Sequence, residues 1–319
     1  MSPTMPTPQI TAAICTYNRY ELLGAAIQSL TAQTLPRERF EIIVVDNSPD
    51  HAQSEEMAQD YRHIPNLRWI YEATPGLSNA RNVAARSAKA PLIAYMDDDA
   101  IAAPDWLQTL VSVFDAFGPE AQVVGGRVDP IWGVPKPLWL PGDLLGYVSV
   151  VDWGGSDRFA GDKEWVAGTN ITFRVDSLKS VGGFSVHLGR SRAGHALLSN
   201  DETDVVERLA AKGGRLVYSP RVVVSHLVPA DRLSQTWFRR RVSWQAVSDY
   251  LADAAGLFDR APSYWRTVTD YFAKLPPKYR SPRGLYIEHD DPELFRHQMS
   301  ALYNFTVVML TGFQGVDRP

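Results

Sequence analysis

The first hundred residues alternate between short apolar runs and stretches with helical spacing. The apolar runs fall at residues 10–15, 40–45, 67–72 and 91–96. Between the first two runs, apolar residues recur on one side of a predicted helix over 20–33, and Pro36 ends it. Two more helices are expected over 51–62 and 76–88. Strands and helices that alternate at this rhythm predict an open α/β sheet with right-handed crossovers.

After residue 100 the pattern is less regular. It predicts helices over 104–117 and 205–212 and strands over 123–128, 166–173, 216–219 and 222–225. Residues 130–162 are rich in Trp, Pro and Gly and show little periodicity, so we expect a functional loop or lid there. The tryptophans of this loop either stack on a substrate or pack the loop onto the body of the protein: Trp132, Trp139 and Trp153.

The apolar run at 91–96 ends in three consecutive carboxylates, Asp97, Asp98 and Asp99. Adjacent like charges repel, and none of them can be buried without a partner. A cation is therefore expected at the end of this strand, and hard divalent ions such as Mg²⁺ and Mn²⁺ prefer oxygen ligands. The alternative is a solvated acidic turn or a set of helix caps.

Two other polar clusters follow predicted strands, one containing Asn18 and one containing Asp46. In open α/β sheets, ligands bind outside the carboxyl ends of the strands. We therefore expect Asn18, Asp46 and the acidic triplet to line one crevice.

The composition excludes several classes of protein. The 319 residues are 45% apolar with a net charge of -4, which allows a large core and gives no electrostatic reason to expect a nucleic-acid partner. The single cysteine, Cys15, lies in an apolar run, and it predicts a packed core thiol in a reducing compartment. We see no secretory signal and no run of about 18 apolar residues. A cytoplasmic protein is expected, with peripheral contact at the inner face of the membrane as the alternative.

The motifs and their order resemble the family 2 glycosyltransferases of the nucleotide-sugar-dependent GT-A fold. The resemblance covers residues 10 to 230. Its segments are Cys15-Thr16-Tyr17-Asn18-Arg19, Val44-Val45-Asp46-Asn47-Ser48, Gly76-Leu77-Ser78-Asn79-Ala80-Arg81-Asn82, Tyr95-Met96-Asp97-Asp98-Asp99, Gly168-Thr169-Asn170, Gly182-Gly183-Phe184, Asp201-Glu202, Arg208-Leu209, Tyr218-Ser219-Pro220 and His226. It implies a Rossmann-like, mixed but mainly parallel sheet flanked by helices, with a mostly helical C-terminal extension.

The resemblance also implies roles for individual residues. Those expected to bind the nucleotide or sugar are Thr16, Asn18, Arg19, Asp46, Arg81, Asp97 and Asp98. Asp46 would accept a hydrogen bond from the base, and Arg81 would meet base or phosphate unless it forms only a surface salt bridge. Those expected to hold a divalent metal, Mn²⁺ or Mg²⁺, are Asp99, Asp97 and His226. His226 is otherwise a structural histidine.

The expected general base departs from the family pattern. The family commonly has Glu-Asp where this chain has Asp201-Glu202. Counting back from Arg208 places Glu202 at the base position, and we favour it over Asp201, with Asp204 as a third choice. Asp201 can alternatively be a helix cap. One base opposite the leaving group implies inversion at the anomeric carbon.

The resemblance suggests two domains: a catalytic domain over 1–230 and a helical extension over 231–319. Within the first, residues 10–128 would bind the nucleotide and 129–230 the acceptor. Aromatic and basic residues at helical spacing in 231–251 suggest an interfacial helix on an anionic membrane, which would fit a lipid-linked acceptor. Packing of this helix against the protein is the alternative.

The function expected is therefore metal-assisted transfer of a sugar, UDP-sugar favoured, to an acceptor hydroxyl. The acceptor would be a glycan, a lipid-linked sugar or a small molecule. A nucleotidyltransferase or pyrophosphorylase is one alternative, although the glycine-rich loop that holds a triphosphate is missing after the first strand. A nucleotide-sugar-binding protein with a degenerate site is the other.

Overall fold

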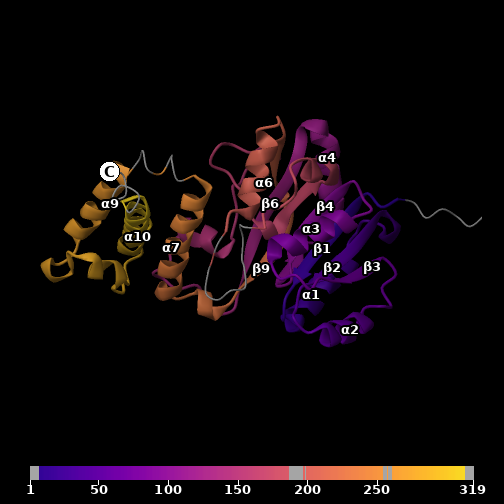
Figure 1. The fold of residues 1–319 in the computed structure, drawn as a ribbon, viewed down its shortest axis with the longest axis horizontal. Helices are drawn as coiled ribbons and strands as arrows, with labels where there is room; N and C mark the ends of the chain where they lie inside the picture. Colours follow the sequence, from indigo (N-terminus) through magenta and orange to yellow (C-terminus); the bar gives the residue numbers. More distant parts are fainter. Residues whose placement is uncertain (1–6, 187–196, 198, 254–256, 258–260, 313–319) are drawn as a thin grey trace, which may run out of the picture. The chain divides into compact units, whose positions relative to one another are not determined.

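The computed structural model describes residues 7–186, 197, 199–253, 257 and 261–312 (Figure 1). The chain divides into two compact units. The first comprises Met1–Ile131, Ser149–Arg192 and Asp201–Leu227. The second comprises Trp132–Val148, Ala193–Asn200 and Val228–Pro319.

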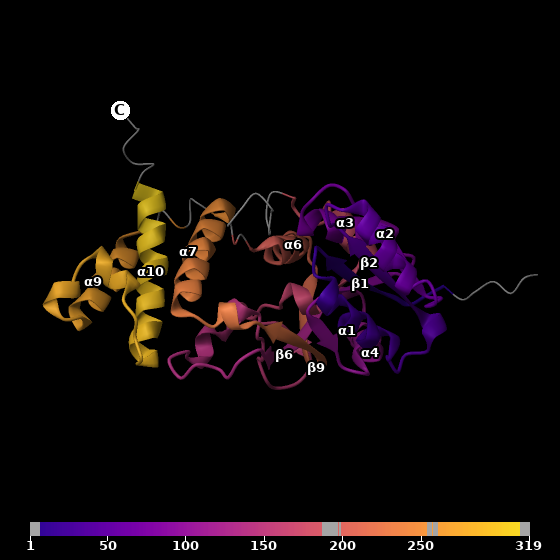
Figure 2. The same ribbon diagram turned by 90° about the horizontal axis from the view of Figure 1, so that it is seen from below.

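A mixed sheet forms the centre of the first unit (Figures 1 and 2). Its strand order is β3 (Leu67–Tyr71), β2 (Phe40–Asp46), β1 (Ile10–Thr16), β4 (Leu92–Asp97), β8 (Ile171–Arg174), β6 (Ala121–Trp132), β9 (Arg215–Val228) and β5 (Ala100–Ala102), with β7 (Arg158–Phe159) paired to β9. The strands β3, β2, β1 and β4 are parallel, and β8 pairs antiparallel with both β4 and β6. The expected mixed α/β sheet is confirmed.

The register of the parallel strands aligns three of the predicted site residues. Thr16 pairs with Asp46, and the neighbouring Cys15 pairs with Asp97. Parallel strands end at the same edge of a sheet, so these residues share that edge.

Helices cover both faces of this sheet. The helices α1 (Tyr20–Thr31) and α4 (Trp106–Phe117) pack on the face that carries Ile10, Ala12 and Ile14. The helices α3 (Leu77–Ser87), α5 (Val175–Ser180) and α6 (Asp201–Ala210) pack on the face that carries Ala13. Successive side chains of a strand point to opposite faces, which is why β1 contributes to both cores. Helix α2 (His51–Asp60) lies beside β3 and is capped by Asp50, whose side chain accepts from Gln53 N.

Two strand predictions were wrong in their bounds. Residues 168–170 form a 3₁₀ turn, and the strand begins only at Ile171. The side chain of Asn170 fixes this turn, since it donates to the carbonyls of Arg127 and Val222 and accepts from Trp106 Nε1. The strands expected over 216–219 and 222–225 are one strand, β9. Pro220 lies between the residues of β9 that pair with β7 and those that pair with β5, so neither pairing uses it.

Short 3₁₀ segments connect several of these elements. They are η1 (Arg37–Arg39), η2 (Gly118–Glu120), η3 (Gly142–Val148), η4 (Gly168–Asn170), η5 (Ala230–Arg232), η6 (Pro277–Tyr279) and η7 (Pro282–Tyr286).

The second unit is helical in its described part, as expected for the C-terminal extension. Helix α10 (Pro292–Gly312) packs against α7 (Gln235–Ala252) and α9 (Ala261–Lys274). Trp139 belongs to this unit and makes edge-to-face contacts with Phe238 and Phe295. Trp139 therefore packs its segment onto protein, which is one of the two roles expected for it.

Helix α7 contains the residues that suggested membrane contact. Phe238 is fully buried, and Arg239 is buried with its guanidinium on Glu288 and on the carbonyl of Ile287. Two of the residues that suggested a lipid-facing helix are therefore buried in the protein. Among the described residues, no helix is both long and apolar enough to cross a membrane.

Candidate active site

The loop between β1 and α1 reaches over the acidic triplet. Thr16 Oγ1 donates to Asp98 Oδ2 at 2.8 Å. Arg19 lies next to it, with NH1 3.0 Å from Asp98 Oδ1 and NH2 2.6 Å from Asp99 Oδ2. Asn18 takes the left-handed conformation, with φ of 50°, which asparagine tolerates better than most residues. Its backbone N donates to Ser48 Oγ at 2.9 Å, which ties the loop to the end of β2.

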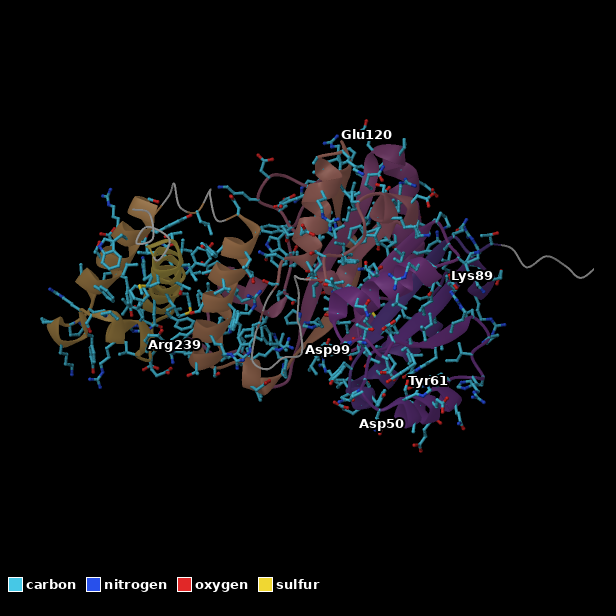
Figure 3. All side chains as sticks on the ribbon, in the orientation of Figure 1. Asp50, Tyr61, Lys89, Asp99, Glu120 and Arg239 are labelled. Carbon is cyan, nitrogen blue, oxygen red and sulfur yellow. The ribbon has the colours of Figure 1, made fainter. Side chains whose placement is uncertain are left out.

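The three aspartates have different environments. Asp98 and Asp99 are buried, whereas the side chain of Asp97 is one-third exposed (Figure 3 marks Asp99). Burial raises the pKa of Asp98 to about 7, against the opposing effects of Arg19 and Thr16. Burial would also raise the pKa of Asp99, but the hydrogen bonds and charges of His226 and Arg19 lower it below its usual value. Asp99 therefore stays ionised.

Asp97, Asp99 and His226 form a cluster that can hold a metal ion. Each offers one ligand atom, and these atoms lie within 4.8 Å of one another. His226 comes from β9, where pairing with Ala100 of β5 brings it to the triplet, and its Nε2 lies 3.2 Å from Asp99 Oδ1. Apart from this contact with His226, Asp99 Oδ1 is a buried atom without a hydrogen-bond partner, and His226 Nδ1 is a second one. Two carboxylates and an imidazole with unsatisfied buried atoms fit Mn²⁺ or Mg²⁺.

Asp46 is fully buried at the end of β2. Its Oδ2 accepts from the hydroxyl of Tyr20 at 2.7 Å, and its Oδ1 accepts from Ser48 N at 3.0 Å. Each oxygen of Asp46 therefore already has one donor from the protein. Tyr20 was not among the predicted site residues, because the sequence shows it only as the first residue of a helix.

Arg81, Asp201 and Glu202 form the second charged cluster. Arg81 NH1 lies 2.8 Å from Asp201 Oδ2 and 2.8 Å from Glu202 Oε1, and its NH2 lies 3.8 Å from Asp97 Oδ1. The Arg81 side chain is only 3% exposed. Burial and the charge of Glu202 raise the pKa of Asp201, while Arg81 outweighs burial and lowers the pKa of Glu202. The two acids expected to provide the base thus share one arginine.

Local structure explains how Arg81 reaches this position. Asn47 accepts from Gly76 N at 2.7 Å and donates to the carbonyls of Glu72 and Thr74, so the end of β2 fixes the start of α3. Gly76 has φ of 133°, a conformation that L side chains rarely adopt. One turn into α3, Arg81 faces the sheet.

Gly168 was matched as part of a motif but had no expected role. A Cβ added there would lie 1.7 Å from Glu202 Oε1 and 2.3 Å from Arg81 NH2. Only glycine leaves room for the ion cluster. Thr169 is also new to the site, since its Oγ1 accepts from Asp97 N at 3.2 Å. In the sequence, only the Gly168-Thr169-Asn170 motif indicated that Gly168 and Thr169 belong to the site.

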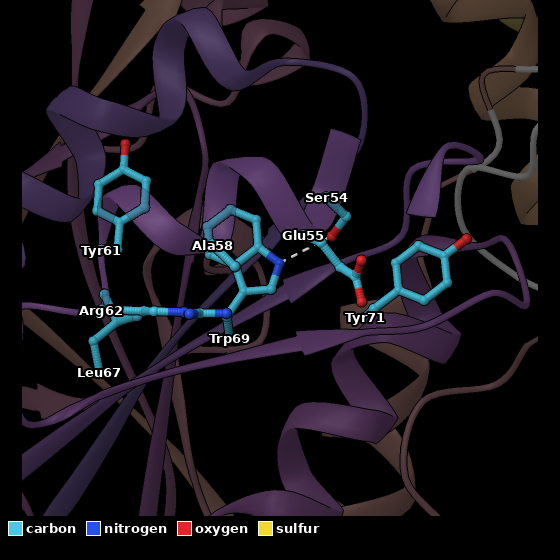
Figure 4. Close-up of a pocket in the computed structure, with 8 residues that line it drawn as sticks. All are labelled: Ser54, Glu55, Ala58, Tyr61, Arg62, Leu67, Trp69 and Tyr71. Atoms are coloured by element: carbon cyan, nitrogen blue, oxygen red, sulfur yellow. Dashed lines mark hydrogen bonds between the residues drawn. The ribbon is translucent and has the colours of Figure 1, made fainter. Parts of the chain in front are cut away.

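A separate hollow of about 350 Å³ lies between α2 and β3 (Figure 4). Trp69 forms part of its wall, and Trp69 Nε1 donates to Ser54 Oγ at 3.0 Å. None of the predicted site residues lines it, so it is not part of the site described here.

Residues 11–148 match the family model described as Glycosyl transferase family 2. Over these residues the chain resembles this family, as the motifs suggested. A relative from Haloferax volcanii, "Glucosyl-dolichyl phosphate glucuronosyltransferase", is 28% identical over 77% of this chain and 77% of its own length. "Succinoglycan biosynthesis protein ExoM" from Rhizobium meliloti is 27% identical over 74% of this chain and 72% of its own length. The expectation that this protein is a glycosyltransferase is confirmed.

Solved structures share the fold of this protein. Mannosyltransferase PcManGT from Pyrobaculum calidifontis, in complex with GDP-Man and Mn²⁺, has a TM-score of 0.56 at 19% identity, over 98% of this chain and 77% of its own. S. aureus TarS 1–349 in complex with UDP has a TM-score of 0.53 at 18% identity, over 96% of this chain and 92% of its own. The fold is that of the GT-A glycosyltransferases.

Proposed function

We propose that this protein transfers a sugar from a nucleoside-diphosphate sugar to an acceptor hydroxyl, with inversion and with the help of a divalent metal. One observation supports this most directly. Arg81 contacts two groups of side chains that approach each other. One is the cluster of Asp97, Asp99 and His226, and the other is the pair of Asp201 and Glu202. A metal-binding group beside a carboxylate pair is the arrangement that this transfer requires.

Asp99, Asp97 and His226 would hold the metal. When bound there, a divalent cation neutralises the charge that develops on the leaving diphosphate. The hydrogen bond between Thr16 and Asp98 keeps the triplet in one conformation and so supports the metal cluster. Arg19 adds a positive charge at the same place.

Glu202 is the carboxylate that we propose as general base. Its side chain is 20% exposed, whereas that of Asp201 is 4% exposed, so Glu202 is the more accessible to an acceptor. The acceptor oxygen attacks the anomeric carbon as its proton passes to Glu202. The bond between that carbon and the phosphate oxygen breaks, and its electron pair leaves with the diphosphate. One displacement inverts the anomeric carbon, and no covalent sugar–enzyme intermediate forms.

The donor that we favour is a UDP-sugar. The structures with this fold were solved with UDP in one case and with GDP-Man in the other, so both nucleotides belong in the first test. For the acceptor we propose a saccharide, either lipid-linked or part of a longer glycan. The printed names of two relatives support this class, since one specifies a glucosyl-dolichyl phosphate and the other the biosynthesis of succinoglycan.

A thermal-shift panel tests the proposal. The protein is heated with UDP, GDP, dTDP or CDP, each with Mn²⁺ and with EDTA. We expect one nucleotide to raise the melting temperature, and only when Mn²⁺ is present. Turnover of the matching nucleotide sugars then identifies the sugar. If every nucleotide leaves the melting temperature unchanged with metal, the proposed donor site is wrong.

A further inference from the structure

Arg81 is enclosed by protein on every side that the contacts describe. Its guanidinium carbon lies 5.3 Å from the centre of the Phe184 ring, and its own carbonyl accepts from Tyr95 OH at 2.9 Å. Its NH1 is shared between Asp201 and Glu202 at equal distances of 2.8 Å. A residue so enclosed has little surface left for a base or a phosphate.

We infer that Arg81 is a positioning residue for the general base and not a nucleotide ligand. A single guanidinium nitrogen holds the carboxylates of Asp201 and Glu202 together and fixes the direction of the Glu202 side chain. This inference rests on the proposed function, because Glu202 must act as the base. It replaces the role that the sequence motif suggested for Arg81.

The position of Gly168 supports this inference independently. The main chain at Gly168 approaches Glu202 Oε1 and Arg81 NH2 so closely that any side chain would displace one of them. Gly168 thus closes the Arg81–Glu202 contact from the opposite side of the cluster. Ser78 completes it, with Oγ 3.3 Å from Asp201 Oδ2. The carboxylate pair is therefore held in place by α3 and by the turn before β8.

The charges of the cluster explain why a base needs this arrangement. Two carboxylates face one guanidinium, so a proton that arrives at Glu202 relieves repulsion from Asp201. The pair titrates as a unit, and burial together with the charge of Glu202 raises the pKa of Asp201 to about 7. Besides Asp201 and Glu202, two other ionisable groups face Arg81: Asp97 from β4 and Cys15 from β1. The two carboxylates share their protons, so the pair, and not Glu202 alone, sets the pH at which the base is free to accept a proton.

The deciding experiment separates nucleotide binding from turnover. Arg81→Lys is compared with the wild-type protein by calorimetry with UDP and with GDP, each with Mn²⁺, and by hydrolysis of the matching nucleotide sugar. Lysine keeps the charge, but its flexible ammonium lacks the planar fork that places NH1 on the two acids and NH2 near Asp97. We expect nucleotide Kd to stay within about twofold and kcat to fall at least about tenfold. Arg68→Lys, at another arginine–carboxylate pair on the same sheet, is the matched control.

A second pair of variants guards against loss of folding. Gly168→Ala keeps both charged side chains but places a Cβ 1.7 Å from Glu202 Oε1 and 2.3 Å from Arg81 NH2, so it should disturb their contact and lower kcat without weakening nucleotide binding. Gly161→Ala is its control, since nothing lies within 4 Å of the added Cβ.

The double variant Arg81→Met with Asp201→Asn keeps the net charge of the buried cluster. Its nucleotide Kd should also match that of the wild-type protein.

The pH profile adds a reading that a purely structural role would not change. Loss of the guanidinium removes the positive charge that favours ionised carboxylates, so Arg81→Met alone should move the acidic limb of kcat upward by about one pH unit or more. A tenfold or greater rise in nucleotide Kd for Arg81→Lys would overturn the inference and restore Arg81 as a nucleotide ligand. A wild-type protein that binds no nucleotide would instead refute the proposed function.

Discussion

Arg19 NH2 lies 2.6 Å from Asp99 Oδ2, so an arginine pairs with one of the carboxylates expected to hold the metal. The same guanidinium lies 3.0 Å from Asp98. A buried carboxylate needs a counter-charge, and Arg19 supplies it when no metal is bound. Metal and Arg19 therefore compete for the negative charge of Asp99.

This competition predicts that Arg19→Ala binds Mn²⁺ more tightly in the absence of nucleotide. The variant removes both the competing charge and its repulsion of a cation. We expect a Kd for Mn²⁺ lowered several-fold, about 1 kcal/mol for each fivefold, measured by electron paramagnetic resonance of free Mn²⁺. Arg68→Ala serves as the control, because its partner Glu41 is not in the metal cluster. An unchanged Kd for Arg19→Ala would show that the arginine moves away without cost.

Asp99 should contribute most of the metal affinity. Asp99→Asn keeps the shape of the side chain but removes the charge of the carboxylate that stays ionised. We expect Mn²⁺ affinity to fall at least about tenfold and the Mn²⁺-dependent thermal shift with nucleotide to disappear. His226→Ala should cause a smaller loss. Glu120→Gln, at an exposed surface carboxylate, controls for net charge. Retention of Mn²⁺ by Asp99→Asn would disprove the assignment.

These metal-site predictions concern residues that the sequence pattern alone had placed near one another. A strand signature followed by charge was enough to place Asp46, the acidic triplet and Asn18 at one edge of the sheet, because parallel strands end together. The motif order added His226, although 127 positions separate it from Asp99 in the printed sequence. Only the pairing of β9 with β5 brings the two side chains together.

Other features depend on side-chain geometry that no motif encodes. The sequence shows Arg81 on a helix near the crevice, but whether it points to solvent, nucleotide or the two acids depends on the packing of α3 and α6. Tyr20 gave no signal, since its bond to Asp46 joins residues 26 positions apart. The break expected at Pro220 was wrong because a proline interrupts hydrogen bonding only where its N–H would have been used.

The pair of Asp201 and Glu202 predicts how stability depends on pH. The pKa of Asp201 is raised to about 7 in the folded protein, so the native state binds more protons than the unfolded chain between pH 4 and 7. Stability from this group is therefore present at low pH and lost as pH rises through about 7. The pKa of Glu202 is lowered, so its contribution to stability changes only below the usual pH range of a glutamate. Above about pH 5 that contribution is constant.

Asp201→Asn isolates this effect. Free energies of unfolding from urea titrations at pH 5 and pH 8 should show the wild-type protein losing stability relative to the variant as pH rises. Asp98 titrates in the same window but is present in both proteins, so it cancels in the comparison. Parallel pH dependences for the two proteins would show that Asp201 is ionised at pH 5.

Cys15 should be chemically inert in the folded protein. Burial, reinforced by the charges of Asp97 and Asp98, raises the pKa of its thiol to about 12. At pH 8 only about one thiol in ten thousand would be ionised, and the thiolate is the reactive form. We expect no labelling by iodoacetamide under native conditions and one label per chain in urea. Rapid labelling of the folded protein would contradict the packed environment.

The aromatic cluster of the second unit should determine the stability of its helices. Phe238 is fully buried on α7 and contacts both Trp139 and Phe295. Phe238→Ala leaves a cavity and loses these ring contacts, at a cost of about 3–5 kcal/mol. Hydrogen exchange measured by mass spectrometry should then show faster exchange throughout α7 and α10. Trp265→Ala is the control, since that ring is 48% exposed, and it should leave exchange in both helices unchanged. Equal effects from the two variants would mean that the second unit does not depend on this cluster.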